Sequence, residues 1–310
     1  MSGRGPGGGC RGQGMFLTAG AVLMCFGASG CSKKRFKEAQ TLGGRKISAA
    51  VLNRGYASYT LYCEACHGKR GDGKGPAAPG TVPPPRDFTK GYFKYVSVPA
   101  RRLPVDADLL RTMNVGIAGS RMPPWDGIAE RRRRDIVQYL KTLSGRWRSE
   151  TPGTPIPQRS DPWKASERRT VAVAQGERVY HGVAQCWECH PSYQDRSTLS
   201  ATLTQLRRAR DTLGLKPVRL RGRLWRADVV PTQYGSLMPP DFLKAELHGG
   251  DALADLYRSV AAGIGGTPMP TWSAKLEVRD LWAVVHYVKS LLRLQGTPSA
   301  KALAKRLRTP

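Results

Sequence analysis

DLLRTMNVGIAGSRMPPW (108–125) recurs further along the chain as DLYRSVAAGIGGTPMPTW (255–272). The two stretches align without a gap at one offset (255 − 108 = 147), and nine of their eighteen residues are identical. A second helical pattern follows each copy, DIVQYLKTL (135–143) and AVVHYVKSL (283–291). The chain therefore contains an internal repeat, and each copy predicts two helices joined by a loop that carries a methionine and a proline.

A C-x-x-C-H motif precedes each copy of the repeat. The first is CEACH (63–67) and the second is CWECH (186–190), and a short helix-like stretch leads into each. On one turn of helix, two cysteines at this spacing can form thioethers to the two vinyl groups of a haem, with the adjacent histidine directed at the iron. The motifs predict two covalently bound haem c groups, held by Cys63, Cys66, His67, Cys186, Cys189 and His190.

Two other chemistries also use paired cysteines. Four thiolates from two C-x-x-C pairs can bind zinc, but His67 and His190 would then have no role. A redox dithiol has no need of a histidine directly after it. The sequence therefore favours haem over both alternatives.

Each half of the chain resembles a class I cytochrome c domain. The resemblance rests on the C-x-x-C-H motifs, on CHGKRGDGKGPAA (66–78) and PPPRDFTKGYFKY (83–95), and on the Met-Pro loops. It implies an all-α fold of two tandem class I domains, each a few short helices around a covalent haem, joined by a Pro-rich linker. In that family the methionine before the proline is the distal iron ligand, which implies that His67 and Met122 hold one iron and His190 and Met269 the other.

Other methionines compete with these two for the distal position. LMPPDF (237–242) aligns with PPPRDF (83–88), so Met238 falls opposite a proline and cannot be a ligand that both copies share. Met113 has Val260 as its counterpart, which predicts core packing.

Three further histidines lie outside the motifs. His248 is the one serious alternative ligand for the second iron, although a solvated loop histidine is the simpler interpretation. His286 lies opposite Gln138 in the repeat, which predicts a surface position. His181 lies shortly before the second motif, on its proximal side, from which it cannot easily reach the distal face.

The N-terminus is typical of a targeting segment. Arginines precede an apolar stretch at 15–29, and ASGC (28–31) resembles a bacterial lipobox, in which Cys31 would be lipidated. Ala28 departs from that pattern, and a plain cleaved secretory signal is the alternative. Of seven cysteines, cleavage before Cys31 would remove two and lipid would occupy the third, so the four motif cysteines leave none for disulfides.

The expected organisation follows from these motifs and from the composition between them. The segments are a signal peptide (1–30), a basic tether (31–49), cytochrome c domain 1 (50–145), a linker (146–171), cytochrome c domain 2 (172–295) with a basic insert (191–234), and a basic C-terminal tail (296–310).

The net charge of +27 and the 40% content of hydrophobic residues indicate a strongly basic globular chain. Basic clusters in the insert and at 131–134 favour an acidic redox protein or respiratory complex as the partner, and a lipid anchor would add a membrane. No nucleic-acid-binding motif accompanies the charge, so we expect no nucleic acid and no small-molecule substrate.

The function that these features predict is single-electron transfer without enzymatic activity, on the periplasmic side of a bacterial cell envelope. The alternatives are a haem enzyme, such as a dihaem cytochrome c peroxidase, and a haem-bearing subunit of a larger respiratory complex. Because both halves carry the same Met-Pro-x-Trp loop, the unlike ligation of a peroxidase is disfavoured.

Overall fold

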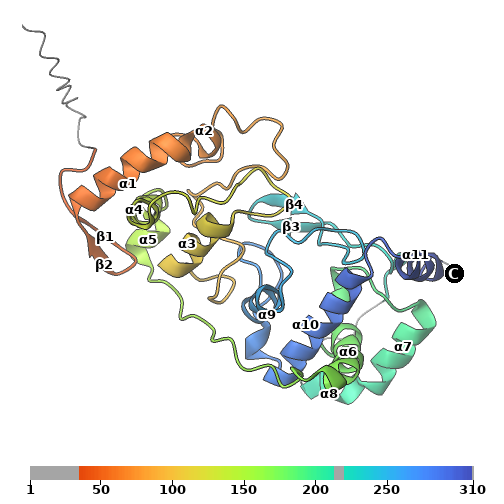
Figure 1. The fold of residues 1–310 in the computed structure, drawn as a ribbon. Coiled ribbons are helices and arrows are strands. Elements are labelled where there is room, and N and C mark those ends of the chain that lie inside the picture. Colours follow the sequence, from red (N-terminus) through yellow and green to blue (C-terminus); the bar gives the residue numbers. More distant parts are fainter. Residues whose placement is uncertain (1–34, 213–219, 309–310) are drawn as a thin grey trace, which may run out of the picture. The chain divides into compact units, whose positions relative to one another are not determined.

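The computed structural model describes residues 35–212 and 220–308 (Figure 1). The expected signal peptide (1–30) and Cys31 lie outside these residues. The described part is mostly helical, with two short hairpins of two strands each, which confirms the predicted all-α class.

Residues 35–149 contain two strands and five helices: β1 (Gln40–Leu42), β2 (Arg45–Ile47), α1 (Ala49–Tyr62), α2 (Glu64–His67), α3 (Asp106–Val115), α4 (Glu130–Lys141) and α5 (Arg146–Ser149), of which α5 opens the expected linker. The later α-helices and strands are α6 (Arg169–Arg178), α7 (Arg196–Gln205), α8 (Arg207–Thr212), β3 (Val230–Thr232), β4 (Gly235–Leu237), α9 (Leu253–Ala262), α10 (Val278–Arg293) and α11 (Pro298–Arg306). Short 3-10 turns lie at Ser166–Arg168, Cys186–Glu188 and Trp272–Ala274, and a π turn at Val179–Val183.

Helices α1 and α4 pack against each other (Figure 1), and Gly55 lies at their contact. A Cβ atom on Gly55 would lie 2.1 Å from the backbone oxygen of Asp135 and 2.9 Å from the Cβ atom of Tyr139. No side chain fits at that separation, so glycine is required for the close approach.

The crossing of α6 and α10 repeats this geometry in the second half. A Cβ atom on Gly176 would lie 2.0 Å from the backbone oxygen of Ala283 and 2.7 Å from the Cβ atom of Tyr287. Ala283 and Tyr287 are the repeat counterparts of Asp135 and Tyr139. The internal repeat of the sequence is therefore also a repeat of helix packing.

The π turn (Val179–Val183) accounts for a difference in length between the halves. Eight positions separate Gly55 from Cys63 (63 − 55 = 8), whereas ten separate Gly176 from Cys186 (186 − 176 = 10). The wider turn and the left-handed Gln185 (φ 53°) absorb the extra residues before the motif.

Buried apolar side chains form two clusters. One is built from α1, α3, α4 and the β1–β2 hairpin, and it includes Met113, which is buried as the sequence predicts. The other is built from α6, α7, α9, α10 and α11. Each C-x-x-C-H motif borders one cluster, since Cys63 packs against the first and Cys186 against the second.

His286 corrects one expectation. It is 7% exposed rather than on the surface, and its Nε2 atom lies 2.9 Å from a carboxylate oxygen of Asp161. Asp161 belongs to the linker, which returns over α10 and also accepts the indole N–H of Trp282 at the backbone oxygen of Arg159. The linker lies outside both copies of the repeat, so the comparison of His286 with Gln138 could not reveal this contact.

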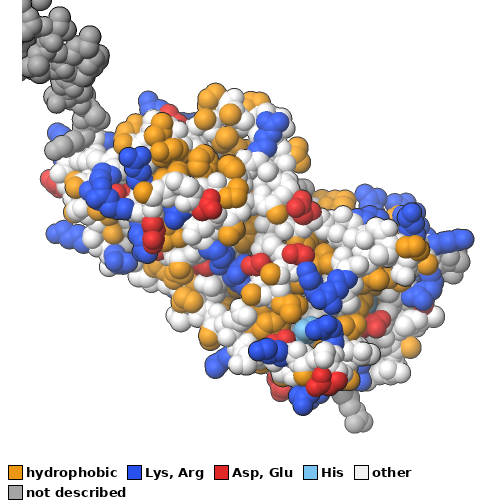
Figure 2. All heavy atoms as spheres, viewed as in Figure 1, with side chains coloured by type: hydrophobic (Ala, Val, Ile, Leu, Met, Phe, Trp, Pro, Cys, Tyr) orange, Lys and Arg blue, Asp and Glu red, His pale blue; other side chains and the backbone are white. Residues whose placement is uncertain are grey.

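Basic side chains are spread over the face shown in Figure 2, with fewer acidic ones among them. Within the described ranges, no helix combines the length and apolar character that crossing a membrane requires.

Candidate haem sites

The first motif lies at the junction of α1 and α2, where Cys63 ends one helix and His67 ends the other. The Nδ1 atom of His67 lies 3.1 Å from the backbone oxygen of Arg86, and its ring stacks on Phe88 with 4.4 Å between centroids. Burial lowers the pKa of His67, so the imidazole is neutral and donates from Nδ1. Its Nε2 lone pair is then available to a metal ion.

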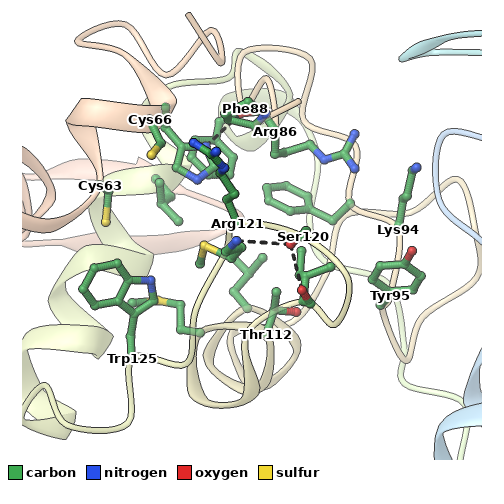
Figure 3. Close-up of a pocket in the computed structure, with 18 of the residues that line it drawn as sticks. Cys63, Cys66, Arg86, Phe88, Lys94, Tyr95, Thr112, Ser120, Arg121 and Trp125 are labelled. Carbon is green, nitrogen blue, oxygen red and sulfur yellow. Dashed lines mark hydrogen bonds between the residues drawn. The ribbon is translucent and has the colours of Figure 1, made fainter. Parts of the chain in front are cut away.

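A cavity that is open to solvent lies beside this motif (Figure 3). Cys63, Cys66 and His67 line it together with Met122. Most of the remaining lining is apolar, including Tyr62, Leu109, Met113, Ile117, Trp125, Ile136 and Leu140. The donor set and the apolar walls fit a haem held by two thioethers, a histidine and a methionine.

Cationic side chains form part of the rim. Figure 3 shows Lys94 and Tyr95 across the cavity from Cys63 and Cys66, with Arg86 between them. Burial lowers the pKa of Arg86, and burial together with the charge of Arg86 lowers the pKa of Lys94 to about 8. A haem carries two carboxylates, so cations here complete the fit.

The Met122 loop is closed by its own backbone. Ile117 N–H donates to the oxygen of Met122 (3.0 Å), and Met122 N–H donates to the hydroxyl of Ser120 (3.1 Å). Gly116 opens the loop at φ 68°, where a Cβ atom would lie 2.6 Å from the oxygen of Met122. Glycine is therefore needed to bring the methionine back against α3.

The second motif repeats the first at the histidine. The Nδ1 atom of His190 lies 3.1 Å from the backbone oxygen of Pro240, and the ring stacks on Phe242 at 5.0 Å. Burial lowers the pKa of His190 to about 4, which keeps the imidazole neutral. The residue after the motif is Pro191 here and Gly68 in the first half. The hydrogen bonding is nevertheless the same, because the hydroxyl of Tyr180 donates to the oxygen of Pro191 as that of Tyr59 does to the oxygen of Gly68.

The Met269 loop has the same closure as the Met122 loop. Ile264 N–H donates to the oxygen of Met269 (3.4 Å), and Met269 N–H donates to the hydroxyl of Thr267 (3.2 Å). Gly263 opens the loop at φ 78°, with a Cβ position 2.7 Å from the oxygen of Met269. The proximal histidine and the methionine loop of the second half thus repeat the local hydrogen bonding of the first half.

The basic insert (191–234) closes over the second motif, which the sequence alone did not indicate. Arg221 donates to the backbone oxygens of Trp187 and His190, and Asp228 N–H donates to that of Cys189 (3.1 Å). Arg221 also forms an ion pair with Asp228 (2.9 Å). Part of the insert therefore binds the motif itself.

Met238 lies just after β4 and is 50% exposed. The role of its segment is to carry Pro240, whose oxygen receives the hydrogen bond from His190. His181 is fully buried: its Nε2 atom accepts from Tyr193 N–H, and its Nδ1 atom contacts the oxygen of Glu177.

His248 lies in a loop and is partly exposed, as the sequence suggested. It lines the cavity of the first half, and its Nδ1 atom contacts the backbone oxygen of Ala118 in the Met122 loop. A residue of the second half thus borders the first site. Sequence reasoning missed this contact because the residues are 130 positions apart.

The alternative chemistries find little support in the described ranges. No three or more His, Cys, Asp or Glu side chains come together there as metal ligands, so the two cysteine pairs do not converge on a zinc site. Burial raises the pKa of Cys63 and of Cys186 to about 12, whereas reactive redox thiols have a lowered pKa.

Known proteins resemble this chain in part. Residues 50–140 match the family described as cytochrome C oxidase, cbb3-type, subunit III. A chain of the reducing HAO-like protein complex of Kuenenia stuttgartiensis is 28% identical, with a TM-score of 0.60, over 77% of this chain and 96% of that chain. No curated protein matches the sequence. The two matches support a c-type cytochrome with covalently bound haem c, acting in haem-based electron transfer.

Proposed function

We propose that this chain is a dihaem cytochrome that passes single electrons between redox partners at the periplasmic side of a bacterial membrane. His67 and Met122 hold one iron, and His190 and Met269 hold the other. The observation that carries the proposal is the repeated bond from the proximal histidine to the carbonyl before an Asp-Phe pair, combined with two methionine loops of the same closure.

A haem iron held by one histidine and one methionine supplies a one-electron Fe(III)/Fe(II) couple. The protein's own residues orient that couple. The carbonyls of Arg86 and Pro240 fix the histidine tautomers. Gly116 and Gly263 allow the methionine loops to turn back toward the helices that precede them. A histidine and a methionine on each iron would leave no position at the metal for a substrate.

The test is a count of haems and of methionine ligands on the full-length protein. We expect the mass of two covalent haems per chain and a far-red sulfur-to-ferric-iron band with the intensity of two His/Met haems. One haem per chain, or a band of half intensity, would contradict the proposal.

Carbon monoxide separates the carrier from a haem enzyme. We propose that the protein has no enzymatic activity, so the reduced form is expected to bind carbon monoxide slowly and incompletely. Rapid stoichiometric binding would indicate an open iron and would favour the peroxidase alternative.

A second candidate is a haem-bearing subunit of a larger redox complex, and the similarity to a chain of the HAO-like complex favours it. A permanent partner would co-purify with the tagged protein at fixed stoichiometry, whereas a transient carrier would be recovered alone. An acidic partner surface is expected in either case, because the chain is strongly basic.

Attachment to the membrane is proposed through lipid on Cys31. Labelled palmitate is expected to enter the native protein and not the Cys31→Ser variant, which would be released into the periplasmic fraction. Release of the native protein without label would indicate a plain cleaved signal.

A further inference from the structure

Tyr234, in the turn of the β3–β4 hairpin, lies where the second half meets the first. We propose that Tyr234 is a positioning residue that couples the two haem sites: its ring acts on the first and its hydroxyl on the second. The inference rests on the proposed pair of haems and goes beyond it, since it assigns a role to the end of the insert.

On the side of the first site, Tyr234 covers two cations. The guanidinium carbon of Arg86 lies 3.6 Å from its ring centroid, and the ammonium of Lys94 lies 5.1 Å away. Both cations line the first cavity, and the backbone oxygen of Arg86 is the partner of His67. The ring of Tyr234 therefore contacts Arg86, the residue whose carbonyl contacts the expected proximal ligand His67.

On the side of the second site, Tyr234 holds the methionine loop. Its hydroxyl donates to the oxygen of Gly265 (2.9 Å), and the preceding Gln233 N–H donates to the oxygen of Gly266 (2.9 Å). Burial raises the pKa of Tyr234 to about 12, so the hydroxyl remains a donor. Both glycines lie inside the loop that the bond from Ile264 to Met269 closes.

Tyr234 and the Met269 loop are tightly packed, both against each other and against the first half. A Cβ atom on Gly266 would lie 2.5 Å from the hydroxyl of Tyr234, and one on Gly265 would lie 1.9 Å from the oxygen of Phe93. Gly265 N–H also donates to the oxygen of Lys94 (3.2 Å). A shift of Tyr234 must therefore move the Met269 loop or the rim of the first cavity.

The charges explain why the ring matters to the first site. Among the described residues, neither Arg86 nor Lys94 forms an ion pair with a carboxylate, so their positive charge is poorly compensated by the protein. The face of Tyr234 stabilises the cations and keeps water from screening them. Positive charge near an iron favours its reduced form, so the covered cations raise the potential of the first haem.

The decisive variant is Tyr234→Phe, which keeps the ring over Arg86 and removes the hydrogen bond to Gly265. We expect the potential of the second haem to fall, because a looser Met269 loop weakens the ligand that raises it. A tenfold change in the one-electron equilibrium constant, about 59 mV, is the expected size. The potential of the first haem should stay unchanged.

Tyr234→Leu removes the ring as well, and both potentials should then fall. Redox titration of the full-length protein measures them, with Met122→Leu and Met269→Leu assigning each wave to its haem. The matched control is Tyr56→Phe, since Tyr56 also packs under an arginine (Arg35, 4.8 Å) but borders neither site.

Unchanged potentials in Tyr234→Phe, or an equal fall in Tyr56→Phe, would overturn the inference. If Tyr234→Leu does not fold, the Phe variant decides alone. Failure of the proposed function is recognised separately, by fewer than two haems or a missing thioether band in the unmodified protein.

Discussion

The carbonyl that precedes an Asp-Phe pair fixes the proximal histidine in both halves, although the residue that bears it is Arg86 in one and Pro240 in the other. A backbone acceptor does not depend on side-chain identity, so this position can vary freely. The freed side chain has a separate use in the first half, where Arg86 lies at the rim of the cavity. Arg86 thus orients His67 through its backbone carbonyl and adds positive charge to the site through its side chain.

Met269 and Met238 provide a test at the residue scale. We expect Met269→Leu to abolish the far-red thioether band of the second haem and to lower its potential, because leucine offers no sulfur. Met238→Leu is the control: Met238 is half exposed, so the spectrum should be unchanged. Loss of the band in Met238→Leu would reverse the assignment.

At the scale of elements, one glycine in each half sets the helix crossing beside the haem motif. The contact is between backbone and backbone, so substitution cannot be relieved by a rotamer change. We expect Gly176→Ala to destabilise the protein by about 2–3 kcal/mol, because overpacking outweighs the ~1 kcal/mol that alanine gains in helix propensity. Denaturant unfolding followed by far-UV circular dichroism measures the difference.

Gly145→Ala is the matched control for this substitution. Gly145 has helical dihedral angles (φ −60°, ψ −27°), and a Cβ atom there would meet nothing within 4 Å. We expect a small stabilisation of about 0.4–1 kcal/mol, since alanine reduces the entropy of the unfolded chain. Equal effects of the two variants would show that the crossing tolerates a methyl group.

A buried ion pair joins α3 to α4. Lys141 is 2% exposed, and its ammonium lies 2.6 Å from a carboxylate oxygen of Asp106. Burial alone would raise the pKa of Asp106, but the hydrogen bond and charge of Lys141 bring it below the usual value. A carboxyl with a lowered folded pKa stabilises the fold above its unfolded pKa, near 3.9, and loses that contribution as the pH falls through the folded pKa.

Asp106→Asn leaves the buried ammonium without its counter-charge. We expect a loss of about 3 kcal/mol of stability at pH 7. At an acid pH, below the usual pKa of an aspartate, the difference in stability between the variant and the native protein should narrow, because Asp106 itself becomes protonated as the pH falls through its lowered pKa. Urea unfolding at pH 7 and at the acid pH measures the free energy of unfolding of both proteins. A difference in stability that is the same at both pH values would contradict the lowered pKa of Asp106.

At the scale of the whole molecule, the sequence predicted what the repeat and the motifs encode. The C-x-x-C-H motifs, the methionine loops and the rejection of Met238 all follow from local patterns or from comparing the two copies. The positions of His248, Arg221 and Tyr234 do not, because their contacts join segments far apart in the chain and occur once each. Comparison of the copies misled us at His286, whose partner Asp161 lies in the linker, outside both copies of the repeat.

The basic residues too were partly predictable: the sequence shows where they cluster along the chain, and the structure shows which of them lie near a haem site. The basic clusters in the sequence predicted an acidic partner, and the structure brings part of the cluster at 131–134 to the rim of the first cavity. Arg132 donates to the hydroxyl of Tyr62 (3.2 Å) and Arg133 to the backbone oxygen of Trp125 (3.1 Å), and both of these acceptor residues line that cavity. The role of such a rim is to steer partners, which depends on long-range charge rather than on contacts.

The net charge of +27 predicts opposite salt dependences for redox reagents of opposite sign. Oxidation of the reduced protein by hexacyanoferrate(III), an anion, should slow by about tenfold between low and physiological ionic strength, because salt screens the attraction. Oxidation by tris(phenanthroline)cobalt(III), a cation, should accelerate over the same range. Stopped-flow absorbance at the haem bands measures both rates.

A local version of this experiment tests the rim itself. Arg131 lies on the exposed face of α4 beside Arg132, so Arg131→Glu removes attraction next to the first cavity. Lys301→Glu on α11 changes the net charge equally and serves as the control. We expect Arg131→Glu to slow the anionic oxidant more than Lys301→Glu does, because steering falls off within a Debye length of about 10 Å at 0.1 M salt. Equal slowing would mean that total charge, and not the rim, directs the encounter.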